Sequence, residues 1–218
     1  MKRKIYIILL CFSLVILSCK KDNFNYPEGF VGSSKITVYP TLTLKGDRYV
    51  PVLNGATFTD PGVEAKEGST DIPVKVNGQV DVTKPGVYTL VYTAVNKDGF
   101  SASISRTVIV ATIDAVAAAN DFSGNYARTT NGSVATWTKI APGIYTVFNP
   151  GGAPGTNLTV VVVNSQGDQI DIPNQAASDG SPTSSANETY NKAASPPRYS
   201  WVILNPGYGT ALRTFIKQ

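Results

Sequence analysis

Side chains that could carry out chemistry are scarce in this sequence. It contains no histidine, and this absence removes the Ser-His-Asp triad, the common zinc ligand sets and the usual general base at neutral pH. The glycine-rich segment 149–155 lacks a Gly-Lys-Ser/Thr sequence and leads into an apolar run that predicts a strand, not a helix. A phosphate-binding loop needs both features, so this segment is not interpreted as one.

Carboxylates are the remaining acid–base groups. Most of the aspartates lie in predicted turns or linkers, where Asp commonly serves turn geometry. A carboxylate pair that hydrolyses a glycosidic bond remains an alternative, as does a calcium site at Asn164, Asp168 and Asp171, although no spacing like that of an EF-hand is present. We predict no catalytic residue, no metal site and no cofactor. The glutamates beyond residue 18 are Glu28, Glu64, Glu67 and Glu188.

Aromatic side chains are the strongest signal for binding. Exposed Trp and Tyr offer a flat apolar face with a polar edge, which suits sugar rings or peptide side chains. The candidate ligand contacts are Tyr190, Tyr208, Trp137 and Trp201. Trp137 and Trp201 lie in predicted strands, where a role in the core is the alternative. Tyr190 and Tyr208 lie in predicted loops and are the better candidates for exposed contacts.

The N-terminal residues have the layout of a secretory signal. Three basic residues at positions 2–4 precede an apolar run from Ile5 to Leu17, which is shorter than the roughly 20 residues that a membrane-spanning helix needs. The run ends at Leu17-Ser18-Cys19 and is followed by two lysines. A small residue directly before a cysteine at this point resembles the bacterial lipobox.

The lipobox resemblance implies cleavage after residue 18 and lipidation of Cys19. Diacylglycerol on the sulfur and an acyl chain such as palmitate on the new amine would anchor the protein to a membrane, because two or more chains are needed for stable anchoring. Cys11 leaves with residues 1–18, so no cysteine remains for a disulfide. Three of the 19 Lys and Arg lie in that segment and none of the 15 Asp and Glu do, so the remaining charge is nearly balanced. No nucleic-acid partner is expected.

Residues 19–34 follow as the lipid anchor and a polar segment containing Pro and Gly, which we interpret as a flexible tether. Packing of Phe24, Tyr26 and Phe30 onto the next domain is the alternative. The start Cys19-Lys20-Lys21-Asp22 resembles that of many Bacteroidota surface lipoproteins, which implies an outer-membrane location with exposure at the cell surface.

Residues 35–110 alternate between apolar and polar side chains. The longest run extends from Val87 to Val95, and Asn77-Gly78 between two alternating pairs of valines predicts a hairpin turn. No helical period of useful length is present. Short strands separated by such turn signals predict a β-sandwich.

The same segment is similar to the bacterial-surface immunoglobulin-like family. The resemblance rests on Phe58-Thr59-Asp60-Pro61-Gly62-Val63-Glu64-Ala65, on the run from Pro85 to Ala94, and on Asp98-Gly99. It covers nearly all of residues 36–110. It implies a seven-strand sandwich with a spacer or interaction role and no catalytic residues.

A short linker at residues 111–121 precedes a second all-β domain at 122–218. Seven predicted strands suggest an antiparallel meander or a small barrel: Gly124–Arg128, Val134–Ile140, Ile144–Phe148, Leu158–Val163, Gln169–Ile172, Tyr199–Leu204 and Ala211–Ile216. Residues 173–198 are rich in Ser, Pro and Ala and are interpreted as a long loop, either disordered or a plain insertion, or a loop that binds a ligand or partner.

The second domain resembles the C-terminal region of Bacteroidota lipoproteins that are often encoded beside importers of the starch-utilisation type. This resemblance implies a non-catalytic accessory that binds a glycan or oligopeptide for an outer-membrane importer complex. The alternative is a structural or adhesin-type surface protein that binds other proteins and no small molecule. Both hypotheses fit the anchor, tether and two β domains.

Overall fold

The computed structural model describes residues 25–32 and 34–218. The predicted signal peptide and Cys19 lie outside the described residues. Within them, no helix has the length and apolar character needed to cross a membrane. The described residues up to Val38 and those from Tyr39 to Gln218 belong to two separate units. In the first unit, strands β1 (Phe30–Val31) and β2 (Ser34–Lys35) form a small antiparallel hairpin with exposed side chains, which the interpretation of this segment as a tether did not foresee.

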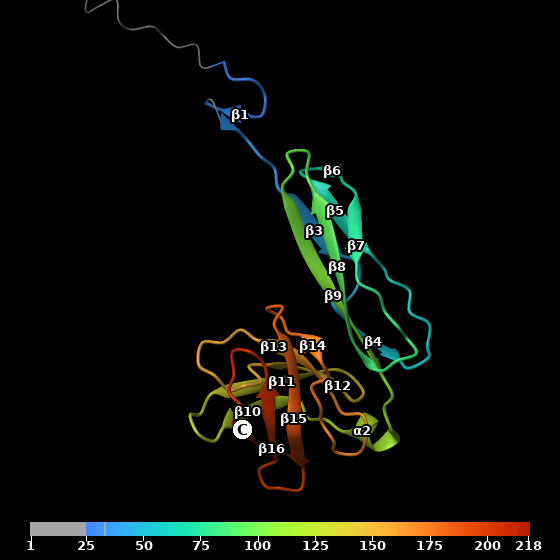
Figure 1. Cartoon of the computed structure of the whole chain (residues 1–218), viewed down its shortest axis with the longest axis vertical. Coiled ribbons are helices and arrows are strands. Elements are labelled where there is room, and N and C mark those ends of the chain that lie inside the picture. The colour runs from blue at the N-terminus through green and yellow to red at the C-terminus, as the bar shows by residue number, and fades with distance from the viewer. Residues whose placement is uncertain (1–24, 33) are drawn as a thin grey trace, which may run out of the picture. The chain divides into compact units, whose positions relative to one another are not determined.

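The first domain is a sandwich of two sheets (Figure 1). One sheet has the strand order β3-β5-β6 and the other β4-β9-β8-β7, which gives the seven strands that the resemblance implies. Strand β4 runs parallel to β9, and the other pairs are antiparallel. The strands are β3 (Pro40–Leu44), β4 (Tyr49–Leu53), β5 (Val63–Glu67), β6 (Thr70–Asp71), β7 (Val74–Asn77), β8 (Gly86–Val95) and β9 (Ser101–Ala111).

The predicted hairpin turn at Asn77-Gly78 does not form. β7 pairs instead with β8, and no strand follows Gly78 directly. Gly78 has a φ of +109°, and a Cβ built on it would lie 2.2 Å from the carbonyl oxygen of Thr89. The glycine therefore serves a close approach of the chain to β8, not a two-residue turn.

A buried arginine ties the two sheets of the sandwich together. The Arg106 side chain on β9 is 0% exposed and donates from Nη1 to Oδ1 of Asp60 at 2.7 Å. Its Nη2 donates to the carbonyls of Lys45 and Gly62, and the Tyr92 hydroxyl donates to the same Asp60 oxygen at 2.7 Å. The Asp60-Pro61-Gly62 segment that carries the family resemblance thus supplies the anion that a buried guanidinium requires.

A short helix, α2 (Ala115–Ala119), begins after Asp114, which caps it by accepting a hydrogen bond from the amide of Ala117. Eight strands of the second domain follow in the order β13-β12-β11-β10-β17-β16-β15-β14. Two antiparallel meanders therefore join at β10 and β17. The strands are β10 (Gly124–Arg128), β11 (Val134–Ala141), β12 (Ile144–Phe148), β13 (Thr159–Val163), β14 (Gln175–Ala176), β15 (Pro182–Asn191), β16 (Arg198–Leu204) and β17 (Arg213–Lys217).

The interpretation of residues 173–198 as one long loop was wrong, because β14 and the ten-residue β15 lie within it. β15 pairs with β16 from Ser184 opposite Leu204 to Asn191 opposite Arg198. Its side chains are mostly polar, so hydrophobic alternation gave no signal, and cross-strand pairing supplies the stabilisation instead. Residues 169–172, in contrast, contribute only a single bridge between Asp171 and Val163 and are not a strand.

Side chains help to close the sheet into a barrel-like form between β13 and β14. Gln175 accepts a hydrogen bond from the amide of Val161 at 2.7 Å and donates to its carbonyl at 2.8 Å. The Ser178 hydroxyl accepts a hydrogen bond from the amide of Thr159 at 2.9 Å, and the backbone amide of Ser178 donates to the Thr159 carbonyl at 3.0 Å. The edge of β13 is thereby satisfied and offers no template for further pairing. The all-β prediction, a sandwich followed by an antiparallel barrel-like domain, is confirmed.

Residues 39–218 form one compact unit, and an apolar cluster joins its two domains. Ile109 and Ala111 at the end of β9 pack with buried residues of β12 and β13. These residues are Ile144, Val161 and Val163.

Candidate binding site

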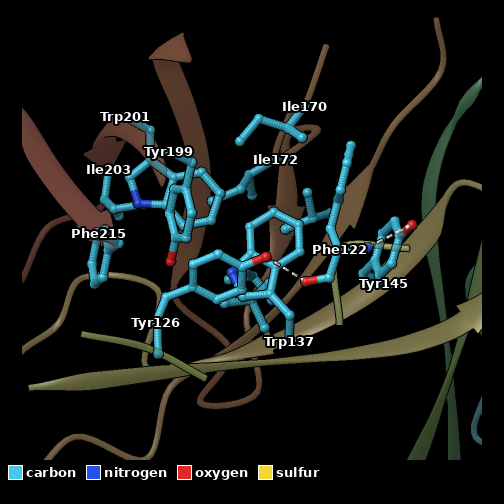
Figure 2. Close-up of a cluster of buried hydrophobic side chains, with 14 of the residues drawn as sticks. Phe122, Tyr126, Trp137, Tyr145, Ile170, Ile172, Tyr199, Trp201, Ile203 and Phe215 are labelled. Carbon is cyan, nitrogen blue, oxygen red and sulfur yellow. Dashed lines mark hydrogen bonds between the residues drawn. The ribbon is translucent and has the colours of Figure 1, made fainter. Parts of the chain in front are cut away.

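The core of the barrel-like domain holds most of its aromatic side chains. Trp137 on β11 and Trp201 on β16 stack with ring centroids 5.6 Å apart and are 2% and 0% exposed, respectively (Figure 2). The Trp201 indole donates to the carbonyl of Pro150. Both indoles therefore belong to the core, the alternative that the sequence left open, and a ligand arriving from solvent would not touch them.

Tyr190 lies on β15, not in the loop that the sequence predicted for it. Its ring stacks on Phe122 with centroids 3.9 Å apart, and its hydroxyl lies 2.7 Å from that of Tyr126. Burial raises the pKa of both tyrosines. Tyr190 packs against the core and is only partly exposed. Its principal role is therefore to cover the barrel core beside Phe122 and Tyr126.

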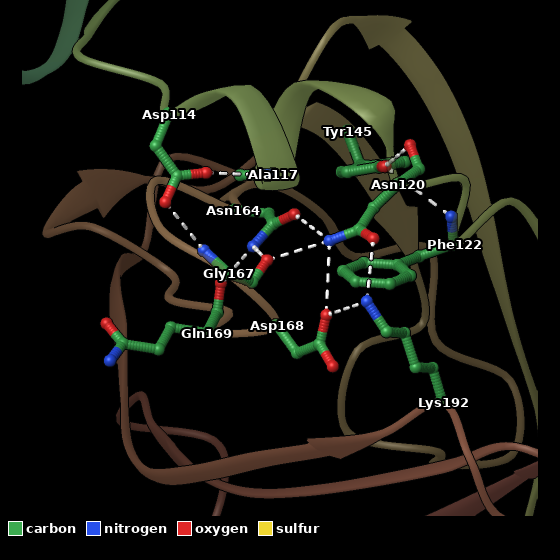
Figure 3. A network of polar contacts seen from close by, with 10 residues as sticks. All are labelled: Asp114, Ala117, Asn120, Phe122, Tyr145, Asn164, Gly167, Asp168, Gln169 and Lys192. Atoms are coloured by element: carbon green, nitrogen blue, oxygen red, sulfur yellow. Dashed lines mark hydrogen bonds and ion pairs between the residues drawn. The ribbon is translucent and has the colours of Figure 1, made fainter.

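A polar network beside Tyr190 holds the linker against the barrel. The amide nitrogen of buried Asn120 donates to Oδ1 of Asn164, to the carbonyl of Gly167 and to Asp168 (Figure 3). Lys192 lies 2.6 Å from Asp168 and also contacts Oδ1 of Asn120. Each group in the network has a partner inside the protein, so the network is structural.

The calcium alternative finds no support in this arrangement. Oδ1 of Asn164 already accepts the hydrogen bond from Asn120, and its amide nitrogen donates to the carbonyls of Gly167 and Gln169. Asp168 is paired with Lys192. Across residues 25–32 and 34–218, no group of three or more His, Cys, Asp or Glu side chains is placed to hold a metal ion.

Tyr208 lies at a different part of the barrel, in the loop before β17. Its ring covers Gly151, where a built Cβ would approach the ring to 2.3 Å, so only glycine allows this packing. The hydroxyl lies 3.3 Å from the Thr156 hydroxyl, and the Arg213 guanidinium lies 5.2 Å from the ring centroid. Tyr208 remains partly exposed. Of the four predicted contact residues, Tyr208 is the one that lies beside side chains with donors for a ligand, those of Arg213 and Thr156.

Two arginines near Tyr208 were not among the contact residues predicted from the sequence. Arg213 begins β17 and is 6% exposed, and Arg128 ends β10 and is partly buried. Arg213 and Phe215 alternate on one face of β17, so the two-residue period could have indicated that Arg213 faces inward with the core. The proximity of Arg128 could not be read from the sequence, because it depends on the pairing of β10 with β17.

A cleft of about 340 Å³ with a mixed polar and apolar lining lies where the two domains meet. It is lined by outward-facing residues of the β8–β9 pair, including Thr89, Ser105 and Thr107, and by the segment 175–180. The hydroxyl groups of Thr89, Ser105 and Thr107 suit the hydroxyl groups of a saccharide.

Fold and site together define an all-β protein with an immunoglobulin-like sandwich and a barrel-like domain that bears the candidate contacts. Residues 42–110 match the family model described as "Bacterial surface protein, Ig-like domain", so the sandwich is a domain of the kind found in bacterial surface proteins. No curated protein matches the chain.

Among solved structures, one match is the lipoprotein BT2262 from Bacteroides thetaiotaomicron. It is 25% identical, and the alignment covers 83% of this chain and all of the other, with a TM-score of 0.41.

Proposed function

We propose that this chain is a lipid-anchored bacterial surface protein that binds a nutrient, a glycan or an oligopeptide, as a non-catalytic accessory of an outer-membrane importer. The observation that carries the proposal is the surface-protein Ig-like domain at residues 42–110. In this proposal the sandwich is the spacer, and the barrel-like domain beyond it makes the contacts. Leu17-Ser18-Cys19 would supply the anchor.

The hydrogen bonds between polar side chains inside the sandwich support the spacer role. Arg106, Asp60 and Tyr92 satisfy one another inside it, which favours rigidity over ligand exchange. The barrel-like domain instead leaves charged donors at one end without acidic partners. The hydroxyl-bearing wall of the cleft at the domain junction, with Thr89, Ser105 and Thr107, adds a second surface for sugar hydroxyls.

The first experiment is a pull-down of the native protein from detergent-solubilised outer membranes, followed by mass spectrometry. Recovery of an importer together with this protein supports the accessory role, and the cargo of that importer then names the ligands to test. A Cys19→Ala variant is the matched control, since it should lose labelling by radioactive palmitate and leave the membrane fraction. Recovery of the lipidated protein alone would contradict the importer association.

An adhesin-type role is the second candidate, and one observation favours it. Tyr39 and Phe100 at one end of the sandwich are exposed and contact each other edge to face, with ring centroids 5.2 Å apart. Exposed aromatic pairs are common anchors in protein interfaces. Recovery of unrelated surface proteins in the pull-down, lost in a Tyr39→Ser/Phe100→Ser variant, would favour this role.

A further inference from the structure

Arg128 and Arg213 face the same side of the barrel wall. In the antiparallel pairs of this sheet, Arg128 lies opposite Phe215, and Arg213 lies opposite Trp201. Side chains directly opposite each other in an antiparallel pair share a face, and Phe215 and Trp201 belong to the core. Both arginines therefore project inward, where the core gives way to the loops 149–157 and 205–212.

The two guanidinium groups are only partly satisfied. Nη1 of Arg128 donates to the carbonyls of Gly151 and Gly152, and Arg213 donates to the carbonyls of Ala211 and Gly209. The Nε atom of each arginine is buried and has no hydrogen-bond partner. Because a guanidinium carries five N–H donors, more than half of the donors of this pair have no partner among the described residues.

The pair also has no counter-charge. Neither guanidinium takes part in an ion pair in the part of the chain that the structure describes. Burial, followed by the positive charge of Arg128, lowers the pKa of Arg213. Burial without an anion is costly for a guanidinium, so a bound anion would relieve both the repulsion and the unmet donors.

The surroundings add groups that suit an organic acid. The ring of Tyr208 gives a flat apolar face beside Arg213, and the Thr156 hydroxyl lies next to the Tyr208 hydroxyl. Gly151 and Gly152 bring the backbone close to these side chains, since a Cβ at Gly152 would lie 2.7 Å from Cδ of Arg128. A ligand here would meet cationic donors, a hydroxyl and an aromatic face together.

We infer that Arg128 and Arg213 bind a carboxylate of the ligand, with Tyr208 packing against the adjoining sugar ring or side chain. This inference rests on the proposed binding function and adds the chemical class of its ligand, an acidic one. The planar fork of a guanidinium matches the two oxygens of a carboxylate. The carboxylate could belong to a uronic acid in a glycan or to an acidic peptide, and the test separates these two sources.

The test is isothermal titration calorimetry of the purified protein with paired probes. One arm uses oligogalacturonate and its neutral methyl ester, and the other uses triglutamate and triglutamine. We expect one acidic probe to bind at least tenfold more tightly than its neutral partner, and added salt to weaken that binding. The arm that binds identifies the source of the carboxylate.

Variants then assign the binding to the pair. Arg213→Gln and Arg128→Gln should each lower the affinity for the acidic probe at least tenfold. Arg213→Lys should retain part of the affinity, because it keeps the charge but loses the planar guanidinium. Arg198→Gln, an exposed arginine on neighbouring β16, is the matched control and should bind as the wild type does. Near-ultraviolet circular dichroism verifies that each variant remains folded.

Several outcomes would overturn the inference. These are equal binding of acidic and neutral probes, undiminished binding in Arg213→Gln, binding of inorganic phosphate alone, or no binding of either acidic probe. Recovery of an importer in the pull-down, or binding of the neutral probes, would in such a case leave the proposed function standing. An acidic probe that binds although no importer is recovered would show the reverse, a carboxylate site on a protein with a different role.

Discussion

The sandwich and the barrel-like domain each bury arginine, and they treat it differently. Arg106 in the sandwich is fully buried and has a carboxylate at 2.7 Å, two carbonyls and the Tyr92 ring around it. Arg213 in the barrel-like domain is nearly as buried but has only carbonyls and the Tyr208 ring. Arg106 therefore has a counter-charge inside the protein, whereas Arg213 has none among the described residues.

The two cores also differ in their side-chain composition. The sandwich core is built mainly from Val, Leu and one tyrosine, and the tyrosine hydroxyl is used to hold Asp60. The barrel core is rich in aromatic side chains, which come from β10, β11, β12, β16 and β17 and from Phe122. The comparison indicates that the sandwich is organised for stability. The barrel-like domain combines an aromatic core with two arginines, Arg128 and Arg213, that have no acidic partner among the described residues. Four predictions test this contrast.

The largest effect is expected for Asp60→Ala. Removing the carboxylate leaves Arg106 buried without a counter-charge, which should cost about 3–5 kcal/mol in the free energy of unfolding. The double variant Asp60→Ala/Arg106→Met should recover part of this loss. Urea unfolding followed by circular dichroism measures both, and a cost below about 1 kcal/mol for the single variant would contradict the structural role of the pair.

Alkaline titration should destabilise the sandwich through Tyr92. Burial, helped by the neighbouring carboxylate of Asp60, raises the pKa of Tyr92 to about 12. The folded state thus holds this proton more tightly than the unfolded chain does. The stabilisation is fully present below pH 10 and is lost as the pH rises towards 12, with a magnitude on the order of 2 kcal/mol.

Tyr92→Phe should remove that part of the pH dependence. The barrel-like domain should keep its own, because burial also raises the pKa of Tyr126, Tyr145 and Tyr199. Phenolate absorbance and the free energy of unfolding, both measured across this pH range, report the contributions of Tyr92 and of the tyrosines in the barrel-like domain. Titration of Tyr92 near pH 10 in the folded protein would be inconsistent with its burial.

An intermediate effect is expected for Gln175→Leu in the barrel-like domain. The substitution leaves both backbone groups of Val161 without their side-chain partner, at a cost of about 1–3 kcal/mol. Hydrogen exchange at the Val161 amide should accelerate as the β13 edge opens. Gln166→Leu, at an exposed loop position, is the control, and equal effects of the two substitutions would show that Gln175 does not close the barrel.

The smallest effect on stability is expected for Arg213→Gln. The substitution removes two hydrogen bonds to carbonyls but also relieves the repulsion from Arg128, so the free energy of unfolding should change by less than about 1 kcal/mol. Thermal unfolding in the absence of ligand measures it. A loss as large as that of Asp60→Ala would make Arg213 a structural residue like Arg106 and would erase the contrast between the domains.

The sequence by itself determined the all-β class and the order of a sandwich followed by a barrel-like domain. Alternation such as that of Val87–Val95 is a local property, because the period of two is set by the strand backbone. The resemblance of the segments 58–65 and 85–94 to the bacterial-surface immunoglobulin-like family implied the immunoglobulin-like sandwich. These features depend on residues that are close in the chain, so a single sequence was enough to predict them.

Tertiary structure alone decided which side chains meet. Polar β15 is a strand because β16 pairs with it, and no local pattern marks it. Trp137 and Trp201 are buried and Tyr208 is partly exposed because the closure of the sheet fixes which face is inward. The pairing of β10 with β17 brings Arg128 and Arg213 together although they are distant in the sequence. Register between distant strands is a long-range property, and the candidate site depends on it.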